Sequence, residues 1–180
     1  MDDEETMKFV ADRMLGKLAK QLRMLGYDTL YYRGEDAYPL IRLGRQESRV
    51  ILTRNTKLMA RKAEDMIVRI TEDKPLPQLK ELAQKAGIDM DEERIFSRCL
   101  LCNAVLDPIS RTEAEGKVPD FIFHLQEQFF RCPQCSRIYW PGSHQENMQR
   151  RMEGLFHHKA EGRNSKLETN SNDQNTKSET

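Results

Sequence analysis

The chain has 180 residues, of which 38% are hydrophobic and 32% are charged, and its formal net charge at pH 7 is zero. This length allows one or two small domains that fold without disulfides. No apolar run approaches the roughly 18 residues of a membrane span. The acidic leader, residues 1–6 (MDDEET), lacks the basic and apolar regions of a signal peptide. We therefore expect a cytoplasmic protein without a membrane segment.

The first predicted elements form a strand–helix–strand unit. Residues 8–11 (KFVA) predict a short strand that leads into Asp12. Leucines at helical spacing predict a helix over residues 14–25, and Gly26 is its expected C-cap. Residues 27–32 (YDTLYY) predict the second strand.

The next elements repeat this alternation. Asp36 is a candidate N-cap for a helix that fades near Ser48. Residues 49–53 (RVILT) predict the third strand, because an apolar run here meets a polar turn. Asn55 or Thr56 is expected to cap the helix that follows.

A last strand and helix complete the first half of the chain. Residues 66–70 (MIVRI) predict the fourth strand, and a helix follows that Pro77 opens and Gly87 ends. Strands that alternate with helices imply a parallel sheet with helices on its faces. Residues 7–90 are therefore expected to form an α/β domain.

Polar side chains stand at the carboxyl ends of three predicted strands. Asp12 follows the first strand, Asp36 follows the second and Asn55 follows the third. Ligands of open parallel sheets bind outside the carboxyl ends of the strands, so these residues are candidate catalytic groups. Two carboxylates suit Mg²⁺ or Mn²⁺, and such an ion can activate water for attack on a phosphodiester. The simpler interpretation is that each residue only caps a helix or a turn.

Basic residues are concentrated around the third predicted strand. Between Arg42 and Lys62 the chain has seven bases and one acid. A basic field of this kind attracts phosphates, although a solvated helix surface explains the run equally well. The candidate nucleic-acid-binding residues of this run are Arg42, Arg45, Arg54, Lys57 and Arg61.

The four cysteines form two CxxC pairs, Cys99 with Cys102 and Cys132 with Cys135. Two such pairs in a cytoplasmic chain indicate a structural zinc site with four thiolate ligands. A rubredoxin-like iron site would use the same ligands, and a redox CxxC is a further alternative. Structural disulfides are not expected in the cytoplasm.

The cysteine-containing segment, residues 95–156, also carries Arg137 and Trp140. An aromatic side chain beside bases can stack on and pair with single-stranded nucleic acid, so both residues are candidate RNA contacts. Packing of Trp140 against the rest of the protein is the alternative. Residues 157–180 are polar with few large apolar side chains, which predicts a disordered tail.

Several motifs resemble those of the Mut7-C RNase family. They are FVADRMLGKLAKQLRMLGYDTLYY, then Asp36, then RVILTRN, RCLLCN and RCPQCSRIYWPGSH, and together they cover roughly residues 7–152. The resemblance implies a PIN-like three-layer α/β/α domain joined to a zinc ribbon, with metal-dependent ribonuclease activity. Asp12 and Asp36 match acidic positions of the family. The chain departs at Asn55, where the family pattern usually reads LTRD.

Three functions are compatible with these observations. The first is a Mg²⁺- or Mn²⁺-dependent ribonuclease that acts on RNA, and the aromatic and basic residues favour single-stranded RNA. The second is an RNA-binding protein whose nuclease site has decayed at Asn55, since an amide lacks the negative charge of a carboxylate. The third is a small electron-transfer protein with iron at the four cysteines.

Overall fold

The computed structural model describes residues 6–58, 66–142, 147, 150–152 and 154. Its first half contains a parallel sheet with the strand order β2-β1-β3-β4. The strands are β1 (Phe9–Ala11), β2 (Thr29–Tyr31), β3 (Val50–Thr53) and β4 (Ile67–Arg69). The parallel arrangement of four strands confirms the prediction of a mixed α/β fold.

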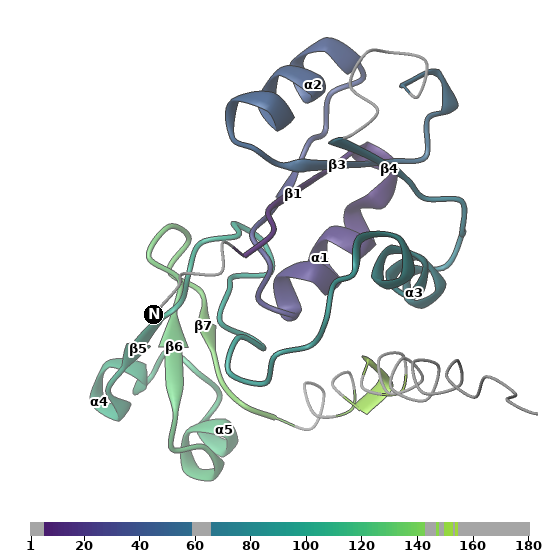
Figure 1. Ribbon diagram of the computed structural model, residues 1–180. Helices are drawn as coiled ribbons and strands as arrows, with labels where there is room; N and C mark the ends of the chain where they lie inside the picture. Colours follow the sequence, from purple (N-terminus) through teal and green to yellow (C-terminus); the bar gives the residue numbers. More distant parts are fainter. Residues whose placement is uncertain (1–5, 59–65, 143–146, 148–149, 153, 155–180) are drawn as a thin grey trace, which may run out of the picture.

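Helices cover both faces of this sheet (Figure 1). On one face lie α1 (Gly16–Met24) and α3 (Pro75–Ala86), and on the other lies α2 (Ala37–Gln46). Successive residues of a strand point to opposite faces. Phe9 and Ala11 accordingly pack in the core that α1 and α3 share, whereas Val10 packs in the core beneath α2.

Most predicted elements are present, with shifted ends. The strands are shorter than predicted, and a 3-10 turn, η1 (Arg13–Leu15), precedes α1. The prediction that Pro77 opens the last helix is wrong, because α3 begins at Pro75, where a proline at the first helical position costs no hydrogen bond. After β3 the structure has the 3-10 helix η2 (Thr56–Leu58), and the residues from 59 to 65 lie outside the described part of the chain.

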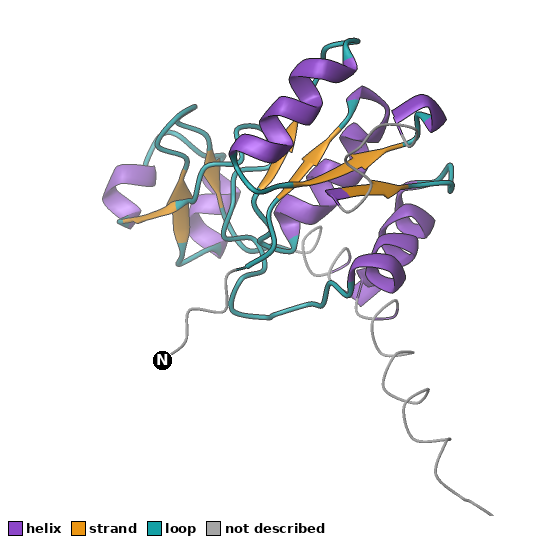
Figure 2. Cartoon of the chain, turned by 45° about the horizontal axis from the view of Figure 1, so that its top comes forward, coloured by secondary structure: helices purple, strands orange, loops and turns teal. Residues whose placement is uncertain are grey.

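The second half of the chain contains an antiparallel sheet (Figure 2). Its strands are β5 (Asp107–Ile109), β6 (Phe129–Arg131) and β7 (Ile138–Tyr139), in that order. Two short helices, α4 (Arg111–Ala114) and α5 (Asp120–Leu125), connect β5 to β6. The predicted leader, apart from Thr6, and the predicted tail lie outside the described residues.

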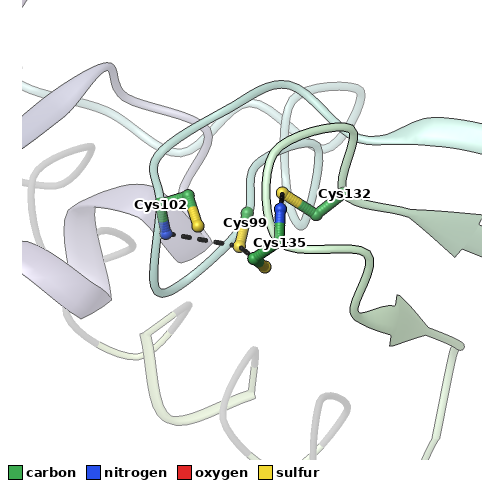
Figure 3. Close-up of side chains that lie close together, drawn as sticks. All are labelled: Cys99, Cys102, Cys132 and Cys135. Atoms are coloured by element: carbon green, nitrogen blue, oxygen red, sulfur yellow. Dashed lines mark hydrogen bonds between the residues drawn. The ribbon is translucent and has the colours of Figure 1, made fainter.

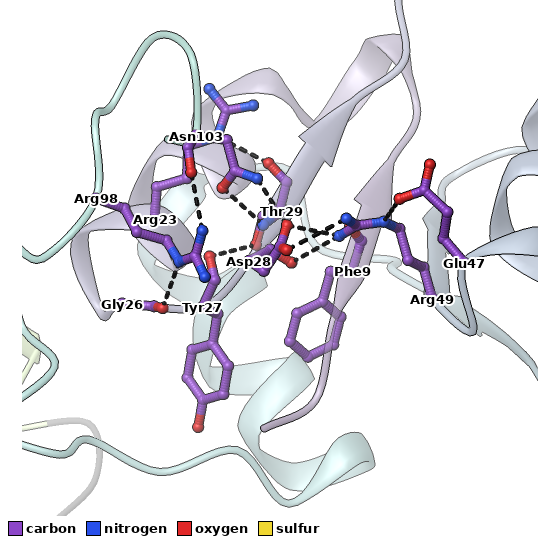
Figure 4. A network of polar contacts seen from close by, with 10 residues as sticks. All are labelled: Phe9, Arg23, Gly26, Tyr27, Asp28, Thr29, Glu47, Arg49, Arg98 and Asn103. Carbon is purple, nitrogen blue, oxygen red and sulfur yellow. Dashed lines mark hydrogen bonds and ion pairs between the residues drawn. The ribbon is translucent and has the colours of Figure 1, made fainter. Parts of the chain in front are cut away.

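A polar network joins the two halves (Figure 4). Asn103 accepts a hydrogen bond from the backbone N–H of Thr29 (2.9 Å) and donates one to Asp28 (2.6 Å). The buried Arg23 donates to the carbonyl oxygens of Leu100 and Leu101, both at 2.9 Å. The loop that starts at Cys99 is thereby fixed against α1 and the start of β2.

Candidate active site and metal centre

The first candidate site lies where the strand order changes direction. The connection through α1 leads from β1 to the neighbouring β2, and the connection through α2 crosses to β3 on the other side of β1. A crevice forms at such a switch point outside the carboxyl ends of the two central strands. Asp12 directly follows β1, and Asn55 follows β3 by two residues.

Asp12 is held firmly at this switch point. The residue is only 7% exposed, and one carboxylate oxygen accepts a hydrogen bond from the N–H of Met14 (2.8 Å). The other oxygen accepts hydrogen bonds from the N–H of Arg54 (3.2 Å) and from the Thr53 hydroxyl. Asp12 therefore caps η1, as its simpler interpretation expects, and also joins the ends of β1 and β3.

Thr53 is a site residue that the sequence pattern did not single out. Its side chain is fully buried at the last position of β3. The hydroxyl donates to Asp12 and accepts a hydrogen bond from the N–H of Asn55 at 3.0 Å. A threonine that ends a buried strand beside a candidate carboxylate is the sequence signal for this role.

The other two candidate residues are more exposed. Asn55 accepts a hydrogen bond from the N–H of Lys57 (3.0 Å) and so caps η2. Asp36 precedes α2 without a side-chain capping bond. Its neighbour Glu35 forms an ion pair with Arg13 at 2.7 Å.

One cavity of about 280 Å³, the strand-end cavity, is lined by Asp12, Asp36 and Asn55 together. Tyr32 and Arg54 also contribute to its wall. Among the described residues, the carboxylates here do not form a group of three that is close enough to hold an ion by itself. The structure thus gathers the three predicted residues around one space, and their catalytic role stays a prediction.

The four cysteines do form such a group (Figure 3). Their sulfur atoms lie within 4.8 Å of one another, and those of Cys99 and Cys135 are 3.7 Å apart. A tetrahedral ion with metal–sulfur bonds of about 2.3 Å requires sulfur atoms about 3.8 Å apart. The backbone N–H of Cys102 points at the sulfur of Cys99, as that of Cys135 does at Cys132. The cluster is therefore shaped to bind a metal ion, consistent with structural zinc.

The comparison with known families covers both sites. A family model described as the Mut7-C RNAse domain matches residues 7–152. The chain belongs to this family. No curated protein matches the sequence. Membership in the Mut7-C RNAse domain family indicates a ribonuclease-like function with RNA as the substrate. None of the described helices is long and apolar enough to cross a membrane.

The thiol pKa values in this Mut7-C chain reflect the crowding of the cysteines. Burial raises the pKa of Cys99, but hydrogen bonds, led by that with the Tyr139 hydroxyl, outweigh it and bring the pKa to about 6. The hydrogen bond with Cys135 raises the pKa of Cys102 to about 12, and burial raises that of Cys132. One thiolate forms readily while its neighbours resist further negative charge, and a bound cation relieves that resistance.

The basic run of the Mut7-C domain is divided by the fold. Arg42 and Arg45 are exposed on α2, and Arg45 lies in its last turn, away from the strand-end cavity. Arg54 lines that cavity and forms an ion pair with Asp73, whereas Lys57 is exposed on η2 and is not part of the cavity wall. Arg61 lies outside the described residues.

Arg49, which contributes to the same run, is unavailable to a ligand. Its side chain is 7% exposed and is bound to Asp28 and Glu47. In the second half of the chain, Arg137 is exposed and Trp140 is half-buried against the core that contains Phe129. Both line one cavity, so the packing of Trp140 and its exposure to a ligand are compatible.

Proposed function

We propose that the chain is a metal-dependent ribonuclease that hydrolyses RNA phosphodiester bonds at the strand-end cavity. In this proposal residues 7–90 have a PIN-like fold, and residues 95–156 form a zinc ribbon. The observation that carries the proposal is the gathering of Asp12, Asp36 and Asn55 around one cavity at the sheet's switch point. Family membership supplies the substrate class.

The donor atoms at this cavity suit a hard cation. Asp12 and Asp36 offer carboxylate oxygens, and Asn55 offers an amide oxygen, which are ligands that Mg²⁺ and Mn²⁺ accept. Asp36 has no hydrogen bond or ion pair with a described residue, so its carboxylate is available. When bound, the ion would activate a water molecule and neutralise charge on the scissile phosphate.

The remaining residues orient these ligands and the substrate. Thr53 fixes the Asp12 carboxylate through its hydroxyl and fixes the Asn55 backbone through the same oxygen atom. Arg54 lines the cavity and Lys57 is exposed on the adjoining η2, so positive charge at both positions would hold an RNA phosphate. The positions of these groups are set by the end of β3, a buried strand that limits their movement.

The four cysteines are proposed to hold zinc as a structural ion. Tetrahedral coordination by four thiolates is the usual closed site for this metal, and its binding energy contributes directly to folding. The fixed loop from Cys99 to Asn103 would then orient the second sheet on α1. Metal analysis with a visible absorption spectrum distinguishes zinc, which is colourless, from the iron of an electron-transfer protein.

A nuclease assay tests the main proposal. Single-stranded RNAs are incubated with the protein with and without Mn²⁺, beside the variant Asp12→Ala. We expect cleavage that requires the ion and falls at least about 100-fold in the variant, since a metal ligand and its orienting contacts are lost together. Circular dichroism checks that the variant is folded, and cleavage that Asp12→Ala leaves unaltered excludes this site.

A second function, RNA binding at a degenerate nuclease site, is favoured by the hydrogen bonds that Asn55 and Asp12 already make. The side-chain oxygen of Asn55 already caps η2, and the Asp12 oxygens already accept three hydrogen bonds. The variant Asn55→Asp separates the two functions, because aspartate can keep the cap and add a charge. If the parent does not cleave RNA and Asn55→Asp does, the parent site is degenerate. If both cleave RNA, the amide of Asn55 is compatible with activity.

A further inference from the structure

A second cavity adjoins the strand-end cavity. This α1 cavity has a volume of about 570 Å³ and lies along α1 between the parallel sheet and the loop that contains Leu100 and Leu101. Arg13 and Met14 line both it and the strand-end cavity. The two spaces are therefore neighbours that share a wall.

A third cavity continues in the same direction. It has a volume of about 430 Å³ and shares Lys20, Leu100 and Leu101 with the α1 cavity. Its far side is formed by the second sheet, with Arg137 and Trp140. Each cavity shares lining residues with the next, and the row of three from Asp12 to Trp140 is here named the α1 path.

Beyond the acidic strand-end cavity, the other two cavities of the α1 path are strongly basic, although the whole chain has no net charge. The acid that lines the α1 cavity, Asp73, is paired with Arg54. The third cavity has no acidic residue in its described lining, and Lys117 and Arg137 add charge there. The bases that line the α1 cavity are Arg13, Lys17, Lys20, Arg23 and Arg33.

Several of these charges are free to bind a ligand. Lys17 and Lys20 are exposed on α1, and neither has a hydrogen bond or ion pair with a described residue. Lys117 is likewise exposed on the loop between α4 and α5. A row of unpaired ammonium groups along a groove is suited to successive phosphates of a polyanion.

Apolar and aromatic side chains line the same cavities as the charges. Met14 is 56% exposed and Leu101 is 48% exposed, and each stands where two cavities meet. Tyr31 lines the α1 cavity, and Trp140 lines the third. Flat or apolar surfaces between charges are what unpaired bases stack on. A duplex hides those base faces, so the arrangement favours a single strand.

We propose that single-stranded RNA lies along the α1 path, from the strand-end cavity across Lys17 and Lys20 to Arg137 and Trp140. The proposal rests on the proposed function for the identity of the ligand as RNA. It assigns RNA binding to the exposed face of α1 and makes the second sheet part of the substrate groove.

The test measures the affinity of the full chain for a fluorescently labelled single-stranded RNA of about 12 nucleotides, within the range of single-strand sites. No divalent ion is added, and recovery of intact RNA is checked. Each phosphate contact contributes about 0.7 to the magnitude of the slope of log affinity against log salt concentration. Relative to 1 M salt, one contact therefore raises the affinity at 0.1 M salt about fivefold. The double variant Lys17→Gln/Lys20→Gln should therefore bind about 25-fold more weakly with a slope smaller by about 1.4.

Two comparisons make this result specific. Lys80→Gln, at an exposed position of α3 outside the path, should leave the affinity within about twofold of the parent. Arg137→Gln, at the far end of the path, should weaken binding about fivefold, since it removes one phosphate contact. Circular dichroism and metal content verify that the variants remain folded and loaded.

The outcomes separate this proposal from the proposed nuclease function. The path proposal is overturned if Lys17→Gln/Lys20→Gln binds single-stranded RNA as tightly as Lys80→Gln does. It is also overturned if the double substitution weakens binding of a duplex of the same length as much as it weakens binding of the single strand. If the losses occur but no RNA is cut with Mn²⁺, the path stands and the nuclease proposal fails. If cleavage depends on Asp12 but Lys17→Gln/Lys20→Gln binds RNA as tightly as the parent, the nuclease proposal stands and the path proposal fails.

Discussion

Replacement of Arg49 by methionine tests how the fold uses its buried charges. The Arg49 side chain donates to both carboxylate oxygens of Asp28, at 2.6 and 3.2 Å, and to Glu47 at 2.7 Å. It also reaches the carbonyl oxygen of Phe9 at 3.3 Å. Methionine keeps most of the aliphatic volume but removes every one of these donors.

The expected cost follows from the burial of the pair. Breaking a buried ion pair by removing one partner costs about 3–5 kcal/mol. Asp28 is 21% exposed on its side chain and keeps its hydrogen bond from Asn103, so we place the loss at the lower end, about 3 kcal/mol at pH 7. Against a typical stability of about 5–15 kcal/mol, this loss is large.

The loss should depend on pH. Burial alone raises the pKa of Asp28, but hydrogen bonds from Arg49 and Asn103 outweigh it, so the folded-state pKa lies below the ordinary value. A depressed pKa contributes stability above the unfolded-state pKa of about 3.9, and this stability is lost as the pH falls through the folded-state pKa. The difference between parent and Arg49→Met should therefore be full at pH 7 and shrink below about pH 4.

Urea denaturation of the metal-loaded chain at several pH values measures this difference. Arg42→Met, at an exposed position of α2, is the matched control and should change stability by less than about 0.5 kcal/mol. A loss below about 1 kcal/mol for Arg49→Met, or one that is the same at pH 7 and pH 3.5, refutes the reasoning.

Three further predictions concern packing, the metal and the site. A Cβ at Gly44 would lie 2.6 Å from the Cγ1 of Ile51, so Gly44→Ala should destabilise the chain by about 1–3 kcal/mol in the same urea assay. Cys99→Ser should lower the bound metal below one equivalent in metal analysis and lower the melting temperature in calorimetry. An unchanged metal content counts against the four-cysteine site. Thr53→Val should reduce Mn²⁺-dependent RNA cleavage at least about tenfold in a folded protein, because it frees Asp12 and Asn55; an unchanged rate removes Thr53 from the site.

Local sequence patterns predicted the parallel sheet well. Each strand is a short apolar run between polar turns, and each helix carries an apolar stripe, so the alternation of elements is visible without tertiary information. The same logic placed Asp12 and Asn55 at one edge of the sheet, where the structure finds them lining one cavity. The start of α3 was misplaced because two prolines, Pro75 and Pro77, both suit the first turn of a helix.

Long-range contacts explain what the sequence did not reveal. Arg49 resembles its basic neighbours in the sequence, but its partner Asp28 is 21 residues away and is fixed in turn by Asn103, 75 residues from Asp28. Lys17 and Lys20 look like the ordinary polar face of an amphipathic helix. Only the placement of the loop at Leu101 beside α1 turns that face into the wall of a groove.

The central claim, cleavage of RNA at the strand-end cavity, is tested most directly by the rate of single-stranded RNA cleavage over a range of Mn²⁺ concentrations. The parent is compared with Asp36→Asn, which removes a carboxylate that has no bond to a described residue, and with Asp120→Asn on α5 as the control. We predict that Asp36→Asn needs at least about tenfold more Mn²⁺ or cleaves at least about tenfold more slowly, while the control matches the parent. Equal rates and equal Mn²⁺ dependence for the parent and Asp36→Asn would contradict the account.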